Sequence, residues 1–268
     1  MDKMSLYFFS SAFVSLGAGT LLYLWCVLRK QERAGRYATQ LNVLGAVLLT
    51  MSLLFRSIVA GRGPFSNQYE FALAFAWGIV IVYLYLERSF KVRSLGIFVL
   101  PIALGLMGYA TTVPSTIEPL VPALQNNLLL TTHVAVAIVA YGTFATAFGA
   151  AIMYLVQRRV SASWMPSKDT LEEVGYRAVV IGFPMMVLVL VLGALWANTA
   201  WGRYWGWDPK ETATLITALV YAGYLHAYNL RGWRGTRAAV LLIVGFVATL
   251  FTFFGNLFLG GLHSYSGI

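Results

Sequence analysis

The chain has 268 residues, of which 59% are hydrophobic and only 11% are charged. Soluble domains carry about 25% charged residues, so this composition excludes a soluble globular protein, and it also excludes intrinsic disorder. The single cysteine, Cys26, excludes a disulfide scaffold. It also excludes the CxxC pair that a thiol–disulfide oxidoreductase or a c-type cytochrome would need.

Apolar runs between charged breaks predict an all-α polytopic membrane protein that forms one domain over residues 1–268. The apolar residues suffice for about eight spans of roughly 20 residues each. The expected spans are residues 6–28, 39–60, 70–86, 94–113, 128–156, 178–197, 209–228 and 239–259. The longest polar connection, 157–177, is expected to hold a separate surface helix that starts near Ser167.

The basic residues are divided unevenly between the two sets of connections. Fourteen of the 19 lysines and arginines belong with the loops that follow the odd-numbered spans, and five belong to the other side. The positive-inside rule makes the first side cytoplasmic and predicts both termini on the extracytoplasmic side. We therefore assign the net charge of +9 to membrane topology and not to nucleic-acid binding.

An aromatic segment lies in the expected outer connection between the sixth and seventh spans. Residues 201–207 are Trp-Gly-Arg-Tyr-Trp-Gly-Trp, and Asp-Pro-Lys-Glu follows. Two structural explanations apply, because Trp and Tyr anchor helices at bilayer interfaces and Asp208 with Glu211 forms a capping-box pattern. The density of rings exceeds what an anchor needs. The segment therefore also fits a shelf for a planar ligand such as haem, with Arg203 and Lys210 beside the ligand's anionic groups.

The three histidines separate into a pair and a single residue. His133 is predicted near the outer end of the fifth span and His263 just beyond the eighth, on the same side as the aromatic segment. Neutral imidazoles bind haem iron axially, so this pair is a candidate for ligating one iron. His226 lies roughly 25 Å along the seventh span at 1.5 Å per residue, too deep to share that iron. The alternative for each is a hydrogen-bonded residue inside the bundle.

The aromatic segment with the four residues after it resembles the WWD signature of haem-handling membrane proteins. Residues 221–226, Tyr-Ala-Gly-Tyr-Leu-His, continue it as in the CcsA (ResC) branch, which belongs to System II of cytochrome c biogenesis. His133 at the head of a helix and His263 after the last helix match the flanking histidines of this branch. Residues 64–70, Pro-Phe-Ser-Asn-Gln-Tyr-Glu, resemble its outer loop.

The resemblance implies a cytochrome c haem lyase that is active only with a second membrane protein, CcsB (ResB). The pair would carry haem b across the bacterial cytoplasmic membrane or the plastid thylakoid membrane. Outside, it would join the haem to the CxxCH thiols of an apocytochrome c. A thiol reductant would be an indirect partner. His133 and His263 would be the external axial ligands, in bis-histidine coordination, and His226 would supply half of an intramembrane site that CcsB completes.

The resemblance assigns haem binding to an external segment, residues 198–211. The residues concerned are Trp201, Gly202, Arg203, Tyr204, Trp205, Gly206, Trp207, Asp208, Lys210 and Glu211. We assign no catalytic residue, because holding haem beside two thiols works by raising their effective concentration.

Two other functions stay open from the sequence. The first is a protein similar to CcmC, which presents haem to a chaperone without attaching it. The number of expected spans and the residues that follow the WWD aspartate favour the CcsA branch over this alternative. The second is a membrane transporter or a quinol-binding subunit that handles no haem, and such a protein would show no Soret absorption when purified.

Overall fold

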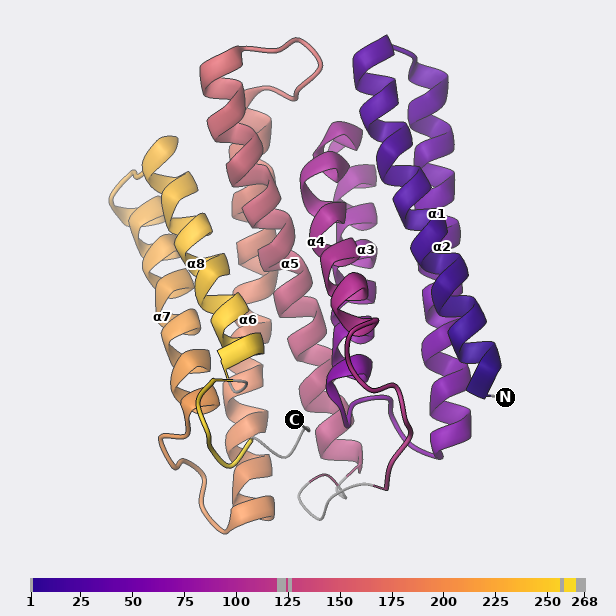
Figure 1. Ribbon diagram of the computed structural model, residues 1–268. Coiled ribbons are helices and arrows are strands. Elements are labelled where there is room, and N and C mark those ends of the chain that lie inside the picture. Colours follow the sequence, from indigo (N-terminus) through magenta and orange to yellow (C-terminus); the bar gives the residue numbers. More distant parts are fainter. Residues whose placement is uncertain (1, 120–123, 125–126, 256–257, 264–268) are drawn as a thin grey trace.

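The structure is a computed structural model that describes residues 2–119, 124, 127–255 and 258–263 (Figure 1). These residues form α-helices and one short 3-10 helix, and no strand occurs among them. The elements are α1 (Asp2–Arg29), α2 (Glu32–Ala60), α3 (Gln68–Phe90), η1 (Arg93–Leu95), α4 (Gly96–Ala110), α5 (Asn127–Val160), α6 (Lys168–Trp201), α7 (Pro209–Leu230) and α8 (Thr236–Phe254). The predicted all-α fold is confirmed.

Seven of the helices are long and apolar enough to cross a membrane, so the chain is an integral membrane protein. Each of the eight apolar runs expected from the sequence does form a helix, but α7 does not reach the apolarity of a span. The number of membrane spans, eight, therefore stays a prediction.

The expected surface helix between the fifth and sixth spans does not exist as a separate element. Ser167 does cap a helix, because its side chain accepts a hydrogen bond from the Thr170 amide at 3.1 Å. That helix, α6, then continues without interruption to Trp201. Its first turns are already held by burial of Leu171 and Val174, so the polar start and the apolar span are one helix.

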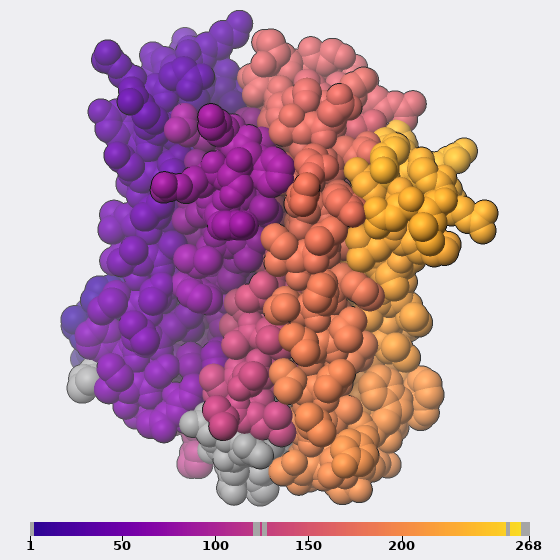
Figure 2. Space-filling view, turned by 180° about the vertical axis from the view of Figure 1, so that it is seen from behind, coloured from indigo at the N-terminus to yellow at the C-terminus, as the bar shows by residue number. Residues whose placement is uncertain are grey.

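The helices are arranged around α5, which contacts α3, α4, α6 and α8. The α1–α2 hairpin flanks α3 and α4 on one side, and α7 and α8 lie on the other (Figure 1). Seen from behind, α6 runs along the molecule between these two parts (Figure 2). The approach of α3 to α5 depends on small residues, as in other membrane bundles: a Cβ on Gly142 would lie 2.7 Å from the carbonyl oxygen of Gly78.

The connections lie at the two ends of the bundle, and they are divided as the distribution of lysines and arginines predicts. The α1–α2, α3–α4, α5–α6 and α7–α8 connections lie at the upper end in Figure 1, and the α6–α7 connection lies at the lower end with residue 263. The basic loops therefore share one end of the molecule. Which end faces the cytoplasm stays a prediction from the positive-inside rule.

A buried ion-pair cluster fixes the loop that leads into α3. Glu70 accepts hydrogen bonds from Arg56 Nε at 2.8 Å and from Arg62 Nη1 at 3.0 Å, and the side chains of Arg56 and Glu70 are both fully buried. Arg56 also donates to the carbonyl of Ser115 at 2.8 Å. Asn67 caps α3 by accepting from the Glu70 amide at 2.9 Å. The roles of Asn67 and Glu70, which the sequence leaves open, are thus to position the start of α3.

We expect Glu70→Ala to destabilise the protein strongly, because it leaves the Arg56 guanidinium buried without its carboxylate. Breaking one partner of a buried pair costs about 3–5 kcal/mol. Glu173→Ala is the matched control, since the Glu173–Arg177 pair is exposed and such pairs contribute about 0–1 kcal/mol. Thermal unfolding in detergent measures both, and equal shifts in the two variants would contradict the structural role of Glu70.

Candidate functional site

A large pocket opens at the end of the bundle where the aromatic segment lies. It encloses about 1120 Å³ when the space open to solvent at its mouth is counted. Side chains from α3, α5, α6, α7 and α8 line it together with residues 204–205 and 263. The pocket therefore gathers residues that are far apart in the sequence.

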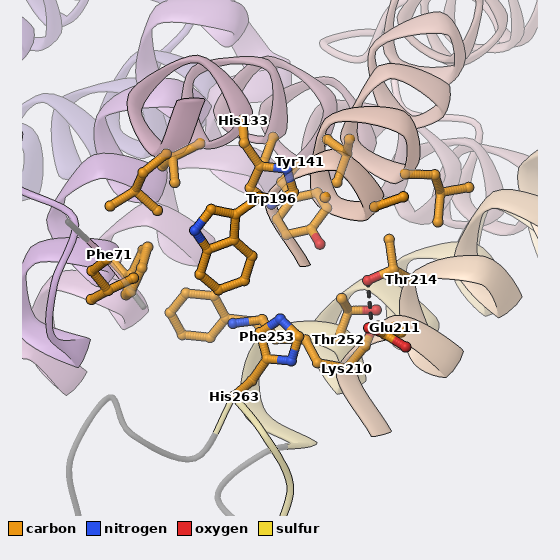
Figure 3. A pocket seen from close by; sticks show the side chains of 18 of the residues that line it. Phe71, His133, Tyr141, Trp196, Lys210, Glu211, Thr214, Thr252, Phe253 and His263 are labelled. Carbon is orange, nitrogen blue, oxygen red and sulfur yellow. Dashed lines mark hydrogen bonds between the residues drawn. The ribbon is translucent and has the colours of Figure 1, made fainter. Parts of the chain in front are cut away.

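His133 projects into this pocket from the second turn of α5 (Figure 3). Its Nδ1 atom is buried and has no hydrogen-bond partner within the described part of the chain. The ring interacts with the backbone of Val189 and lies so close to α6 that a Cβ on Gly193 would approach its Cε1 to 3.1 Å. A buried ring nitrogen without a partner is unfavourable, so His133 is suited to binding something that occupies the pocket.

His263 reaches the same pocket from the segment that follows α8, and in Figure 3 the two histidines lie on either side of Trp196. Its Nδ1 lies 2.8 Å from Oδ1 of Asp208. The other carboxylate oxygen accepts a hydrogen bond from the Leu262 amide at 2.6 Å. Such a carboxylate orients an imidazole and fixes its tautomer, which directs the lone pair of Nε2 away from Asp208.

The charges of this pair follow from the same contacts. Burial lowers the pKa of His263, and the carboxylate of Asp208 offsets only part of that effect. Burial alone would raise the pKa of Asp208, but hydrogen bonds from His263 and from the amides of Lys210 and Leu262 outweigh it and lower the pKa to about 2. At neutral pH Asp208 is therefore an anion and His263 a neutral imidazole, the form that binds a metal.

The aromatic segment does not form one flat shelf. Tyr204 and Trp205 line the pocket, whereas Trp201 lies behind His263, with 4.8 Å between the ring centroids. Trp207 is 69% exposed and does not line the pocket. Its ring meets that of Trp205 in an edge-to-face contact, with 5.6 Å between the ring centroids. Only part of the predicted set thus faces a ligand in the pocket.

The polar residues of the segment shape the loop. Asp208 and Glu211 form the predicted capping box at the start of α7, and Glu211 also accepts a hydrogen bond from the Gly206 amide at 2.8 Å. Gly202 adopts a left-handed conformation at φ 71° and ends α6, and only glycine takes that conformation without strain. Arg203 is exposed.

Lys210 lines the pocket, and its ammonium lies 5.6 Å from the ring centroid of Phe71. Of the two cations that the sequence places beside the ligand, only this one lies in the pocket wall. The charge that faces a bound anion is therefore that of Lys210.

His226 lies apart from the other two histidines, as predicted. It occupies the C-terminal half of α7 and is exposed on the outer surface of the bundle. Ile216, Leu219 and Leu230 are exposed on the same helix, and the position of a Cβ on Gly223 has no atom within 4 Å. These residues follow one another at intervals of three or four, so they form a single stripe.

Five aromatic residues of the pocket lining were not predicted as part of the site: Phe71, Phe75, Tyr141, Trp196 and Phe253. Trp196 is buried in the wall, 5.5 Å from His263 between centroids, and Phe71 and Phe253 also line the pocket. A signal existed for Trp196, which precedes Trp201 by five residues at the outer end of a span. Nothing in the sequence separates Phe71 or Phe253 from the many other aromatic residues of the spans, because only the packing of α3 and α8 brings them here.

The chain matches known proteins over most of its length. The profile of the family "Cytochrome C assembly protein" matches residues 65–263. The protein "Cytochrome c biogenesis protein CcsA" of Guillardia theta is 37% identical, over 84% of this chain and 83% of the relative. The CcsA proteins of Synechococcus elongatus and Porphyra purpurea are 34% and 31% identical, over 92% and 95% of this chain and 93% and 95% of theirs.

Among solved structures, the chain is similar to the "Cytochrome c Heme Lyase CcmF", with a TM-score of 0.73 and 20% sequence identity. The likeness covers 94% of this chain and 46% of that chain, so the chain spans less than half of its structural neighbour. At this identity the likeness concerns the fold: the helices of the two proteins follow the same arrangement.

We expect Asp208→Asn to keep the helix cap but release the segment that holds His263. Asparagine caps helices about as well as aspartate, but it has one acceptor oxygen where Asp208 uses two, for the amides of Lys210 and Leu262. Hydrogen exchange should therefore stay slow at the Lys210 amide and become about tenfold faster at the Leu262 amide, as the loss of one charge-assisted hydrogen bond predicts. Unchanged protection at both amides would show that the second oxygen holds nothing.

Proposed function

Because the chain belongs to the CcsA family of cytochrome c assembly proteins, we propose that it presents haem for covalent attachment to apocytochrome c, together with a CcsB (ResB) partner. A role in cytochrome c biogenesis belongs to the family itself. Haem as the cargo, its two histidine ligands and the need for CcsB are the parts that we propose.

The observation that carries the proposal is the pair of histidines in one pocket. His263 is the last residue of the family's matched region and His133 lies 130 residues before it, yet both line the same cavity. The Nδ1 of His133 has no hydrogen-bond partner among the described residues, and His263 is oriented by a carboxylate. No group of three or more His, Cys, Asp or Glu side chains that could hold a bare metal ion occurs among the described residues. Two imidazoles, in contrast, suffice for an iron that a macrocycle already holds.

The walls of the pocket suit a planar macrocycle that carries carboxylates. The indoles of Trp196 and Trp205 and the rings of Phe71 and Phe253 supply an apolar lining, which is what small-molecule pockets use to bury a ligand. Lys210 places one cation in the same wall, where an anionic edge group of the ligand would be paired.

In this mechanism the protein contributes orientation. His133 and His263 hold the haem, Asp208 keeps His263 in one tautomer, and the open mouth leaves an edge of the ligand accessible to the two thiols of a CxxCH segment. Fixing both reactants next to each other raises their effective concentration. We place the pocket on the extracytoplasmic side, in agreement with the charge distribution of the loops.

We propose that His226 takes part in a second site shared with CcsB. Its position on the outer stripe of α7 points it away from this chain's own core, so that a ligand on the other side of the iron must come from another protein. The glycine at position 223 leaves room for a close approach of a partner helix.

We predict that His133→Gly and His263→Gly each weaken or shift the Soret band of the protein purified with CcsB. Added imidazole should restore the spectrum, because it fills the vacant axial position. His226→Gly is the contrasting variant: it should reduce the haem content of the whole complex, and imidazole should not restore the outer site selectively. Wild-type spectra in both outer variants would remove these histidines as ligands.

The two outer tryptophans form a matched pair for the stacking argument. Trp205→Ala should lower haem retention, with base–aromatic stacking at about 1–3 kcal/mol per ring as the nearest analogue. Trp207→Ala should have a much smaller effect, since that ring is 69% exposed and lies outside the pocket wall. The haem-to-protein ratio after purification measures both, and equal losses would mean that the pocket does not define the haem site.

A further inference from the structure

A second pocket lies at the opposite, basic end of the molecule. It is lined by the end of α1, the start of α2, the end of α3 with the start of η1, and the α5–α6 connection. Its volume, including the open mouth, is about 1240 Å³. The α1–α2 hairpin precedes residues 65–263, the region that the family profile matches, so this pocket forms at the seam between the hairpin and that region.

Three cations face this pocket: Lys30, Lys91 and Arg93. The acids near them are Glu32, whose side chain is 93% exposed and lies 3.8 Å from Arg93, and Glu87, which also lies 3.8 Å from Arg93. Both acids are therefore directed to the arginine. Neither lysine forms an ion pair with any described residue, so their charges are available to an anion.

Glu87 offsets the charge of Arg93 and does not line the pocket. It is buried, and its carboxylate accepts hydrogen bonds from Tyr23 at 2.5 Å and from Thr39 at 2.7 Å. The two hydroxyl donors satisfy the hydrogen-bonding capacity of this carboxylate but do not remove its charge. Three cations against the carboxylates of Glu32 and Glu87 leave a formal excess of one positive charge, and the two lysines carry it at the pocket without an ion pair among the described residues.

Both lysines have an unusual backbone conformation. Lys30 and Lys91 have φ values of 53° and 55°, the left-handed conformation that L-residues adopt at a cost and that glycine adopts freely. Lys91 is the C-cap of α3, where glycine is usual. Glycine would be less strained at both positions, so replacing the two lysines by glycine is expected not to destabilise the backbone.

The start of α2 adds a weaker attraction for an anion. Glu32, the first residue of α2, lines the pocket, and the N-cap residue Gln31 makes no side-chain capping bond. Uncapped amides and the helix dipole at such an end favour a negative group. The two lysines supply the independent charge that a helix end alone lacks.

We propose that this pocket binds the headgroup of an anionic membrane lipid. The ends of the apolar helices α1 and α3 form its walls, which is the level where a spanning bundle meets lipid headgroups. Apolar side chains of Phe90, Trp164 and Met165 share the lining with the cations, as an amphiphile with a charged head and a glycerol-ester body requires. The ligand chemistry is a tetrahedral oxyanion, and its position favours a lipid over a soluble phosphate.

The test variant is K30G/K91G, which removes both charges and relieves the backbone at both positions. Its thermal stability should be equal to the wild-type value or higher, so a loss of lipid cannot be attributed to misfolding. The matched control is R33Q/K168Q, which removes two exposed positive charges from the same end outside the pocket.

The experiment uses the full chain with CcsB in detergent that contains added phosphatidylglycerol or phosphatidylcholine. Native mass spectrometry counts the bound lipid, and alkylation of Cys26, the only cysteine in the chain and a residue of the pocket lining, reports occupancy. We expect the wild type and R33Q/K168Q to retain phosphatidylglycerol and to react slowly. K30G/K91G should bind it about 30-fold more weakly, as the loss of two lysine–headgroup attractions predicts.

Three results would overturn the proposal. Equal retention by K30G/K91G and R33Q/K168Q would mean that the lipid responds only to the general charge of this end. Equal binding of phosphatidylcholine would mean that the headgroup charge is not recognised. Protection of Cys26 by inorganic phosphate as strong as by phosphatidylglycerol would assign the pocket to a soluble anion. None of these outcomes depends on haem binding, so the result is separable from the proposed function.

Discussion

The carboxylate of Asp208 joins three parts of the molecule at the pocket: the start of α7, the segment after α8 and the imidazole of His263. One oxygen accepts from the Lys210 amide and starts α7, and the other accepts from the Leu262 amide and so anchors the segment after α8. The same carboxylate meets His263. A buried anion is unfavourable without such partners, so the helix start, the terminal segment and the imidazole are mutually dependent. The position of His263 in the pocket depends on this side chain together with the rings of Trp196 and Trp201 that pack against the imidazole.

This dependence explains why a capping residue is also a functional one. A serine or threonine at position 208 would cap α7 equally well in principle, but a single hydroxyl has no second acceptor for the amide 54 residues further along the chain. Aspartate satisfies both demands. The sequence pattern identified the cap, and the structure adds the contact with the histidine.

The sequence predicts those parts of the molecule that depend on local composition. The apolar runs predicted every helix, and the pattern Asp208-Pro-Lys-Glu211 predicted a capping box that the structure contains. The sequence did not predict that α6 would continue unbroken from its cap at Ser167. A polar first turn indicates an exposed segment whether or not a membrane span follows it. Only the packing of α3 and α8 brings Phe71 and Phe253 to the pocket, and the path of the α6–α7 loop decides that Trp207 is exposed.

The composition of α7 follows from its two different faces. The inner face buries hydroxyls and rings: Thr217 shares a hydrogen bond with Thr252 at 3.0 Å, and Tyr221 stacks on Phe144 at 3.6 Å between centroids. Thr252 satisfies the Thr217 hydroxyl, whereas the hydroxyls of Tyr221 and Tyr224 are buried without a hydrogen-bond partner among the described residues. These polar groups lower the apolarity of α7, so it does not qualify as a span by itself.

The outer face carries His226 among aliphatic residues, where a lone imidazole in lipid would be unfavourable. A helix with polar groups on both faces is stable in a bilayer only when protein covers both. The low apolarity of α7, which argues against a span in isolation, therefore agrees with the proposed second site, in which this helix would lie between the bundle and a partner subunit.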